Sequence, residues 1–253
     1  VCSAESGILA GRYNEVINTT PFSAIAGGYY NKICDVSDYS FIGGGHINQI
    51  KGGTTGQGCN VIGGGSSNVI SGSRRTFIGG GIGHIALNSN DFVIGGGNDN
   101  EAVSSGCSVI VGGNKNRSCN TFTFIGSGQC NHTSGSYSTI VGGCCNKASG
   151  ACSIIGGGCG NTATGYGTTI AGGKNNTSSG DYSLIAGVNN TNTDGHYSTV
   201  SGYGNTVSGR YALVAGCNNT VSNYYSSIPG GKSNTISSCC STIGGGNGNV
   251  VNS

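Results

Sequence analysis

The amino-acid sequence predicts an all-β fold, a parallel β-solenoid of about sixteen coils. An aliphatic residue in the pattern S-x-I-x-G-G recurs sixteen times in 253 residues, at intervals of 14 to 20 that settle at 14 or 15 from Ile110 onward. Helical repeats need about 33 residues or more, whereas 14–17 residues, with one longer coil, fit two short strands and two tight turns. The period fills the chain, so we expect one repeat domain over residues 1–253, part of a longer chain.

The strands of each coil are expected to carry two inward rows. Position 0 of the repeat is the aliphatic residue of the pattern, found at Ile8, Ile25, Ile42, Ile62, Ile78, Ile94, Ile110, Ile125, Ile140, Ile155, Ile170, Ile185, Val200, Val214, Ile228 and Ile243. Position −2, mostly Ser or Thr, points to the same side because side chains alternate along a strand. Position +8 supplies a second row of Val, Ile and Ala. The rows predict a thin but continuous core.

Two glycine corners and a row of asparagines are expected to form the turns. Glycine at +2 and +3 marks one corner, and glycine at −5, as at Gly150 and Gly165, marks the other. At −5 we expect a positive φ, which only glycine adopts without strain. Asparagine recurs near +6, with His84 as the clear departure. Stacked asparagines form amide ladders, so we interpret this row as structural.

The unit S-x-I-x-G-G-x-x-N-x-x-S-G resembles the head repeats of trimeric autotransporter adhesins, such as the Yersinia adhesin. It is also similar to repeats of phage and large-virus fibre proteins. The resemblance covers all sixteen coils and implies a left-handed β-roll, a homotrimer, and display on a cell or virion surface. The chain lacks a heptad stalk, and Gly-Gly followed by Asn replaces the family's S-V-A-I-G. The resemblance therefore implies the fold but not the ligand.

Position −1 predicts an apolar stripe on the outer surface. Its large apolar members are Phe41, Val61, Phe77, Val93, Val109, Phe124, Ile154, Leu184 and Leu213. Such a stripe exceeds what a soluble monomer exposes, and position +1 is small enough for a neighbouring chain to approach. We therefore expect this stripe to be the interface of a homotrimer. The alternative is that positions −1 and 0 both face the core.

An aromatic row at position −3 is the candidate binding feature. It includes four consecutive coils, with Tyr182, Tyr197, Tyr211 and Tyr225. Rings about 4.8 Å apart could stack and stiffen the solenoid. The alternative is a platform for carbohydrate.

Two cysteine pairs share a phase in successive coils among the 13 cysteines: Cys130 with Cys145, and Cys144 with Cys159. A strand spacing of about 4.8 Å suits a disulfide, although in-register side chains point the same way and strain it. Both pairs are therefore possible disulfides. Other cysteines, including Cys34, Cys59 and Cys217, are expected to be small buried hydrophobes.

Composition argues against several classes of function. The net charge of +2 and the 8% of charged residues give no basic patch for nucleic acid, and no apolar run is long enough to span a bilayer. The four histidines occupy different phases, and the nine acidic residues are expected not to converge on adjacent coils. We therefore expect no catalytic residues, no metal site and no cofactor.

The leading hypothesis is a non-enzymatic structural or adhesive fibre module, a rigid trimeric rod on a cell surface, outside the cell or on a virion. Its partners would be its own copies and a host surface glycan or protein. The alternative is a monomeric ligand-binding solenoid that binds glycan or ice. Ice binding requires threonine in every coil of a flat face, whereas Thr139, Thr169 and Thr199 alternate with apolar residues at position −1.

Overall fold

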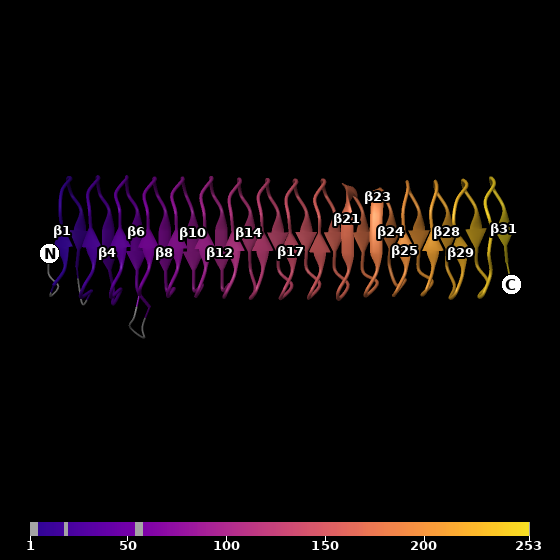
Figure 1. The fold of residues 1–253 in the computed structure, drawn as a ribbon, viewed down its shortest axis with the longest axis horizontal. Coiled ribbons are helices and arrows are strands. Elements are labelled where there is room, and N and C mark those ends of the chain that lie inside the picture. Colours follow the sequence, from indigo (N-terminus) through magenta and orange to yellow (C-terminus); the bar gives the residue numbers. More distant parts are fainter. Residues whose placement is uncertain (1–4, 18–19, 54–57, 253) are drawn as a thin grey trace. The chain divides into compact units, whose positions relative to one another are not determined.

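Strands stacked coil upon coil make up the regular structure of the protein. The structure, a computed structural model, describes residues 5–17, 20–53 and 58–252, and every regular element among them is a strand. The chain divides into two compact units, Val1–Cys130 (unit 1) and Asn131–Ser253 (unit 2). Within each unit, successive coils lie side by side (Figure 1). A parallel β-solenoid of about sixteen coils is thereby confirmed; the single domain over residues 1–253 stays a prediction.

Unit 1 contains two parallel sheets, one from each side of the coil. Its first sheet is formed in order by β1 (Gly7–Ile8), β3 (Ala24–Ile25), β5 (Phe41–Ile42), β7 (Val61–Ile62), β9 (Phe77–Ile78), β11 (Val93–Ile94), β13 (Val109–Ile110) and β15 (Phe124–Ile125). Its second sheet is formed by β2 (Glu15–Val16), β4 (Lys32–Cys34), β6 (Gln49–Lys51), β8 (Val69–Ser71), β10 (Ile85–Leu87), β12 (Glu101–Val103) and β14 (Arg117–Ser118).

Unit 2 repeats this arrangement. Its first sheet is formed by β17 (Thr139–Ile140), β19 (Ile154–Ile155), β21 (Thr169–Lys174), β23 (Leu184–Val188), β25 (Thr199–Val200), β27 (Leu213–Val214) and β29 (Ser227–Ile228). Its second sheet is formed by β16 (His132–Thr133), β18 (Lys147–Ala148), β20 (Thr162–Ala163), β22 (Thr177–Ser178), β24 (Thr191–Asn192), β26 (Thr206–Val207), β28 (Thr220–Val221), β30 (Thr235–Ile236) and β31 (Val250–Val251). Equivalent positions pair in register, as Ile155 does with Ile140 and Ile170.

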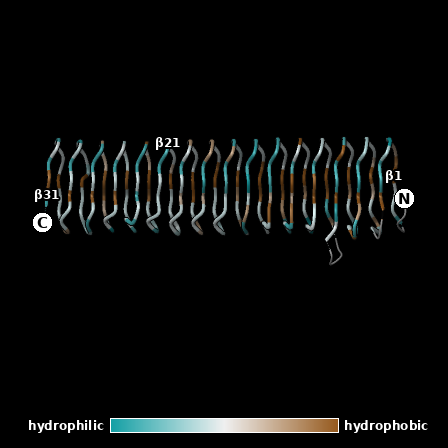
Figure 2. Tube along the Cα trace, turned by 180° about the vertical axis from the view of Figure 1, so that it is seen from behind, coloured by the Kyte–Doolittle hydropathy of each residue, from teal (hydrophilic) through white to brown (hydrophobic). Residues whose placement is uncertain are grey.

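The core of each unit lies between its two sheets, as predicted. Every position 0 residue from Ile25 to Ile243 is buried, with at most 7% of its surface exposed. Figure 2 shows that hydrophobic segments recur in successive coils of each unit. Several inward hydroxyls at position −2 are hydrogen-bonded to the backbone: Ser198 donates to the Gly209 carbonyl (3.1 Å) and accepts from the Ala212 N–H (3.0 Å), whereas the buried hydroxyls of Ser138 and Ser153 have no hydrogen-bond partner within the described residues. Where such a bond forms, the hydroxyl is buried at little cost.

The asparagine row is a hydrogen-bonded ladder, which confirms its structural role. The buried Asn161 donates its backbone N–H to Asn146 Oδ1 and accepts from the Asn176 N–H, both at 3.0 Å. Its Nδ2 donates to the carbonyls of Gly157 and Gly173, each at 3.0 Å. One side chain thus satisfies backbone groups in its own coil and in the next.

His84 replaces asparagine in this ladder without interrupting it. Its Nδ1 accepts the Asn100 N–H at 3.1 Å, and its own backbone N–H donates to Asn68 Oδ1 at 3.0 Å. Burial lowers the pKa of His84, which keeps the ring neutral and Nδ1 available as an acceptor. The imidazole therefore takes the acceptor role of the amide oxygen.

The prediction of positive φ for the glycines at position −5 is wrong. Gly150 and Gly165 have ordinary φ values there, but a Cβ on either would collide with the backbone of the next coil. Positive φ occurs at the Gly-Gly corner, as at Gly158 (87°), and under the aromatic row, as at Tyr182 (52°) and Tyr197 (56°). Glycine at −5 is thus required by the close approach of coils rather than by its backbone angles.

Candidate functional site

The first sheet of each unit presents the predicted apolar stripe to solvent. Of its large members, Phe41, Phe77, Phe124, Ile154, Leu184 and Leu213 are 38–46% exposed, and Val61, Val93 and Val109 are half-buried. The alternative in which position −1 joins the core is wrong, because only position 0 is buried. We call these outward residues the apolar face. The face is unbroken in unit 1, where Phe77 pairs in register with Val61 and Val93.

The apolar face of unit 2 alternates between hydroxyl and aliphatic side chains. Ile154 lies between Thr139 and Thr169, and Leu184 lies between Thr169 and Thr199. Bulky groups therefore project in every second coil, as the sequence predicted.

Four tyrosines of unit 2 form a stacked ladder at position −3. Ring centroids lie 5.4 Å apart for Tyr182 and Tyr197, 5.2 Å for Tyr197 and Tyr211, and 4.9 Å for Tyr211 and Tyr225, with interplanar angles of 10° or less. Tyr166 meets Tyr182 edge-on at 5.3 Å. The predicted stacking is confirmed. Because neighbouring rings cover one another's faces, the ladder presents mainly ring edges and hydroxyls to solvent.

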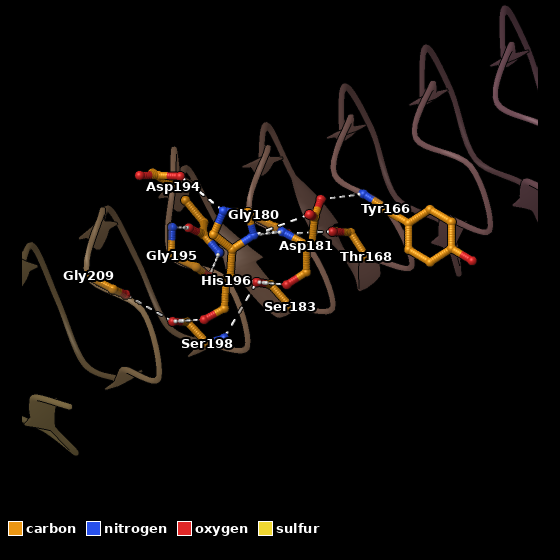
Figure 3. A network of polar contacts seen from close by, with 11 residues as sticks. Tyr166, Thr168, Gly180, Asp181, Ser183, Asp194, Gly195, His196, Ser198 and Gly209 are labelled. Carbon is orange, nitrogen blue, oxygen red and sulfur yellow. Dashed lines mark hydrogen bonds and ion pairs between the residues drawn. The ribbon is translucent and has the colours of Figure 1, made fainter. Parts of the chain in front are cut away.

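At the turn beside this ladder, His196 lies between the carboxylates of Asp181 and Asp194 (Figure 3). His196 Nε2 lies 3.1 Å from Asp194 Oδ1, and Nδ1 lies 3.3 Å from Asp181 Oδ2 and accepts the Asp181 N–H at 3.0 Å. The expectation that acidic residues do not converge on adjacent coils is wrong here. The sequence signal lies between residue types rather than within one, because Asp181 and His196 share position −4 in successive coils.

Nothing in this cluster assembles a nucleophile. The buried hydroxyls of Ser183 and Ser198 donate to the carbonyls of Gly195 (2.7 Å) and Gly209 (3.1 Å) rather than to the imidazole. Other carboxylates form surface ion pairs between coils: Glu15 pairs with Lys32 and Glu101 pairs with Arg117, both at 3.0 Å. Surface pairs of this kind contribute about 0–1 kcal/mol each.

The second sheet of unit 2 carries an array of hydroxyls that was not predicted from the sequence. Six successive coils each present two outward Ser or Thr side chains on either side of an inward residue. We call these twelve residues the hydroxyl face: Thr162, Thr164, Thr177, Ser179, Thr191, Thr193, Thr206, Ser208, Thr220, Ser222, Thr235 and Ser237. All twelve reach solvent, and the threonines at the first site pair in register from Thr162 to Thr235. The signal is visible in the sequence as N-T-x-[ST].

An aromatic cluster with a shallow groove lies on unit 1. Tyr13 stacks on Tyr30 (4.8 Å between centroids), and Tyr29 stacks on His46 (5.6 Å). The groove has a volume of about 410 Å³ and is lined by Tyr30, Lys32, Ile47, Asn48 and Gln49. The sequence gives little signal for it because its residues differ in type from coil to coil.

The cysteines only partly follow the prediction. Cys144 and Cys159 lie side by side with their Sγ atoms 2.6 Å apart, whereas Cys130 and Cys145, in different units, are both exposed. Cys34 is buried, and burial is the main cause that raises its pKa to about 11. The expectation of burial is wrong for Cys59, which is exposed, and for Cys217, which is half-buried.

Neither metal-site clusters nor membrane-spanning helices occur within the described ranges. No group of three or more His, Cys, Asp or Glu side chains there could hold a metal ion. None of those residues forms a helix long and apolar enough to cross a bilayer.

These features define the class of the protein, a parallel β-solenoid repeat protein with chemically distinct outer faces. The chain matches no protein-family model, and no curated protein is significantly similar to it.

Proposed function

We propose that the chain is a non-enzymatic structural module of an attachment fibre, a rigid homotrimeric segment displayed on a cell or virion surface. The observation that carries the proposal is the apolar face, whose unbroken row in unit 1 leaves phenylalanines about 40% exposed. Contiguous apolar surface of this kind is stable in water when another chain covers it. A copy of the same chain offers a matching periodic row, and the similarity of the repeat to adhesin heads and fibre proteins favours three copies.

The small residues beside the apolar face support close association. Position +1 of unit 1 is glycine in four successive coils: Gly43, Gly63, Gly79 and Gly95. A Cβ on each would collide with a carbonyl oxygen of the next coil, so the stacking of coils itself requires glycine here. All four glycines are at least partly exposed, so another chain would meet no side chain at these positions. Fibre subunits need regular, self-complementary surfaces more than a pocket, and the repeat provides such a surface. A host surface glycan or protein would then bind elsewhere along the fibre.

Replacing one phenylalanine of the apolar face by aspartate should dissociate the assembly. Phe77→Asp would place a charge in an apolar contact, at a cost of several kcal/mol per subunit if the carboxylate is left unpaired. We expect light scattering after size exclusion to give a trimer mass for the native chain and one third of it for the variant.

The matched control is Ile82→Asp, a change of the same kind at a side chain that is 57% exposed but lies outside the apolar face. This variant should keep the trimer mass. A native chain that is monomeric, or a Phe77→Asp variant that keeps its native mass and stability, would refute the interface.

A second candidate, ice binding, is favoured by the hydroxyl face. Ice-binding surfaces present hydroxyls and methyls at regular intervals on a flat, uncharged sheet. Here two columns repeat at about 4.8 Å between strands and about 6.7 Å along each strand, which makes a regular two-dimensional grid of hydroxyls. Threonine at position −1 does not form such an array, whereas on the second sheet one column has threonine in six successive coils and the other has threonine in two of these coils and serine in four. Carbohydrate binding by the tyrosine ladder has less support, because its ring faces cover one another.

Ice recrystallisation assays distinguish this candidate from the fibre module. If the hydroxyl face binds ice, the native chain should inhibit recrystallisation, and Thr191→Tyr, which projects a ring from the middle of the array, should abolish the inhibition. Thr199→Tyr, on the first sheet of the same unit, should leave inhibition unchanged. A native chain without effect on recrystallisation excludes ice binding and leaves the fibre proposal intact.

A further inference from the structure

We propose that Cys144 and Cys159 are a redox modification site, where a small-molecule disulfide oxidises the two thiols to a disulfide that clamps two successive coils of unit 2. The inference is independent of trimer formation and of ice binding.

The two thiols converge from in-register turn positions. Cys144 and Cys159 form a parallel bridge, and their backbone N–H groups donate to Gly158 and Gly173, both at 2.9 Å. A spacing of about 4.8 Å between coils lies within the Cα separation that disulfides tolerate. The Sγ atoms are 2.6 Å apart. They need to approach by only about 0.6 Å to reach bonding distance.

Both side chains are within reach of solvent, and the pair is distinctive. Each thiol is half-buried, so a small oxidant can reach it. Among the described cysteines, no other two of one unit share a position on successive coils. Cys217 lies in the same row of turn positions, but its neighbours in the row are Tyr203 and Lys232. It is therefore the natural control, a thiol of similar exposure without a second cysteine beside it.

The contacts indicate which thiol reacts first. The Cys144 thiol donates to Cys159 Sγ, and this hydrogen bond is the main cause that raises the pKa of Cys144 to about 11. Cys144 therefore keeps its proton, and Cys159 is the attacking group.

The chemistry is two successive thiol–disulfide exchanges. The Cys159 thiolate attacks one sulfur of the external disulfide, whose S–S bond breaks and releases one thiolate. Cys144 loses its proton to that thiolate or to water and attacks the Cys159 sulfur, displacing the second small thiol. Two protein thiols have then lost two electrons and two protons, and the external disulfide has become two thiols.

The test incubates the full chain with glutathione disulfide, blocks the remaining thiols by alkylation, and maps tryptic peptides by mass spectrometry. We expect residues 118–147 to be linked to residues 148–174, with the two linked thiols unalkylated. The link must persist in a Cys145→Ser, Cys152→Ser chain, and fragment spectra separate it from the other cysteines of these peptides, Cys119 and Cys130. The oxidised chain should melt at a higher temperature than the reduced chain.

Single-thiol variants make the outcome decisive. Cys144→Ser should stop at a mixed disulfide of glutathione on Cys159 and should lose the shift in melting temperature, while Cys217→Ser should keep both the link and the shift. Should Cys144 and Cys159 of the native chain stay alkylatable at every glutathione ratio, or link to other cysteines, the proposal is overturned. The measurement on the native chain is valid even if a variant fails to fold.

Discussion

Gly173→Ala is expected to destabilise unit 2 by roughly 3–5 kcal/mol, enough to unfold the coils around it. Gly173 has a φ of 102°, where a side chain is strained, and a Cβ there would collide with the backbone of Gly187 in the next coil. The next coil cannot move away to relieve this collision, because Gly187 itself packs equally closely against the backbone of Gly202 in the coil after it. Thermal and urea unfolding followed by circular dichroism measures the loss.

The adjacent residue supplies the control. Gly172 has an ordinary φ, and a Cβ there would have no heavy atom within 4 Å. Gly172→Ala should therefore be neutral, or stabilise by about 0.4–1 kcal/mol by restricting the unfolded chain. Equal effects of the two substitutions would show that the stacked glycines are not under this steric constraint.

The fold was predictable because each coil repeats the same physical requirements. Ile140, Ile155 and Ile170 alone would indicate a strand or a helix, but sixteen aliphatic residues at this spacing are compatible only with stacked coils. The inward hydroxyls at −2 and the asparagine row followed from the same register. Even His84 is predictable in principle as an asparagine substitute, since a neutral imidazole also pairs an acceptor with a donor.

The conformation of the turns was not predictable from composition, because glycine occurs in these turns for two different physical reasons. At Gly150 it avoids a collision between coils, whereas at Gly158 it also supplies positive φ. The sequence shows glycine in both cases. The tyrosines of the aromatic row, such as Tyr182 and Tyr197, also have positive φ, but no glycine in the sequence marks this backbone conformation. Their rings stack between coils at the same positions where the backbone is strained.

The sequence predicted the candidate surfaces whose residues all occupy one position of the repeat. It did not predict those that combine residues from two positions. The apolar face and the tyrosine ladder each occupy a single position of the repeat. The hydroxyl face needs two positions to be taken together, +7 and +9, or +6 and +8 in the three coils whose turn is one residue shorter. His196 contacts Asp194, two residues earlier in its own coil, and Asp181 in the preceding coil. Both groupings leave a signal in the sequence, but it is found only when two positions of the repeat, or two residue types, are compared together.

Asn161→Leu, the second large effect that we expect, should cost roughly 3 kcal/mol or more, although leucine has a similar volume. The change removes the acceptor of the buried Asn176 N–H and the donor to the Gly157 carbonyl, and it cuts the ladder in the middle of unit 2. Asn161→His should lose clearly less stability than Asn161→Leu, because His84 shows that Nδ1 can accept the N–H of the next coil.

The control is Asn247→Leu, at an exposed turn position, which should change the free energy of unfolding by no more than about 0.5 kcal/mol. Denaturant titrations of the three variants rank these effects, and a leucine as well tolerated at 161 as at 247 would mean that packing of Ile and Val, rather than the amide ladder, holds the coils together.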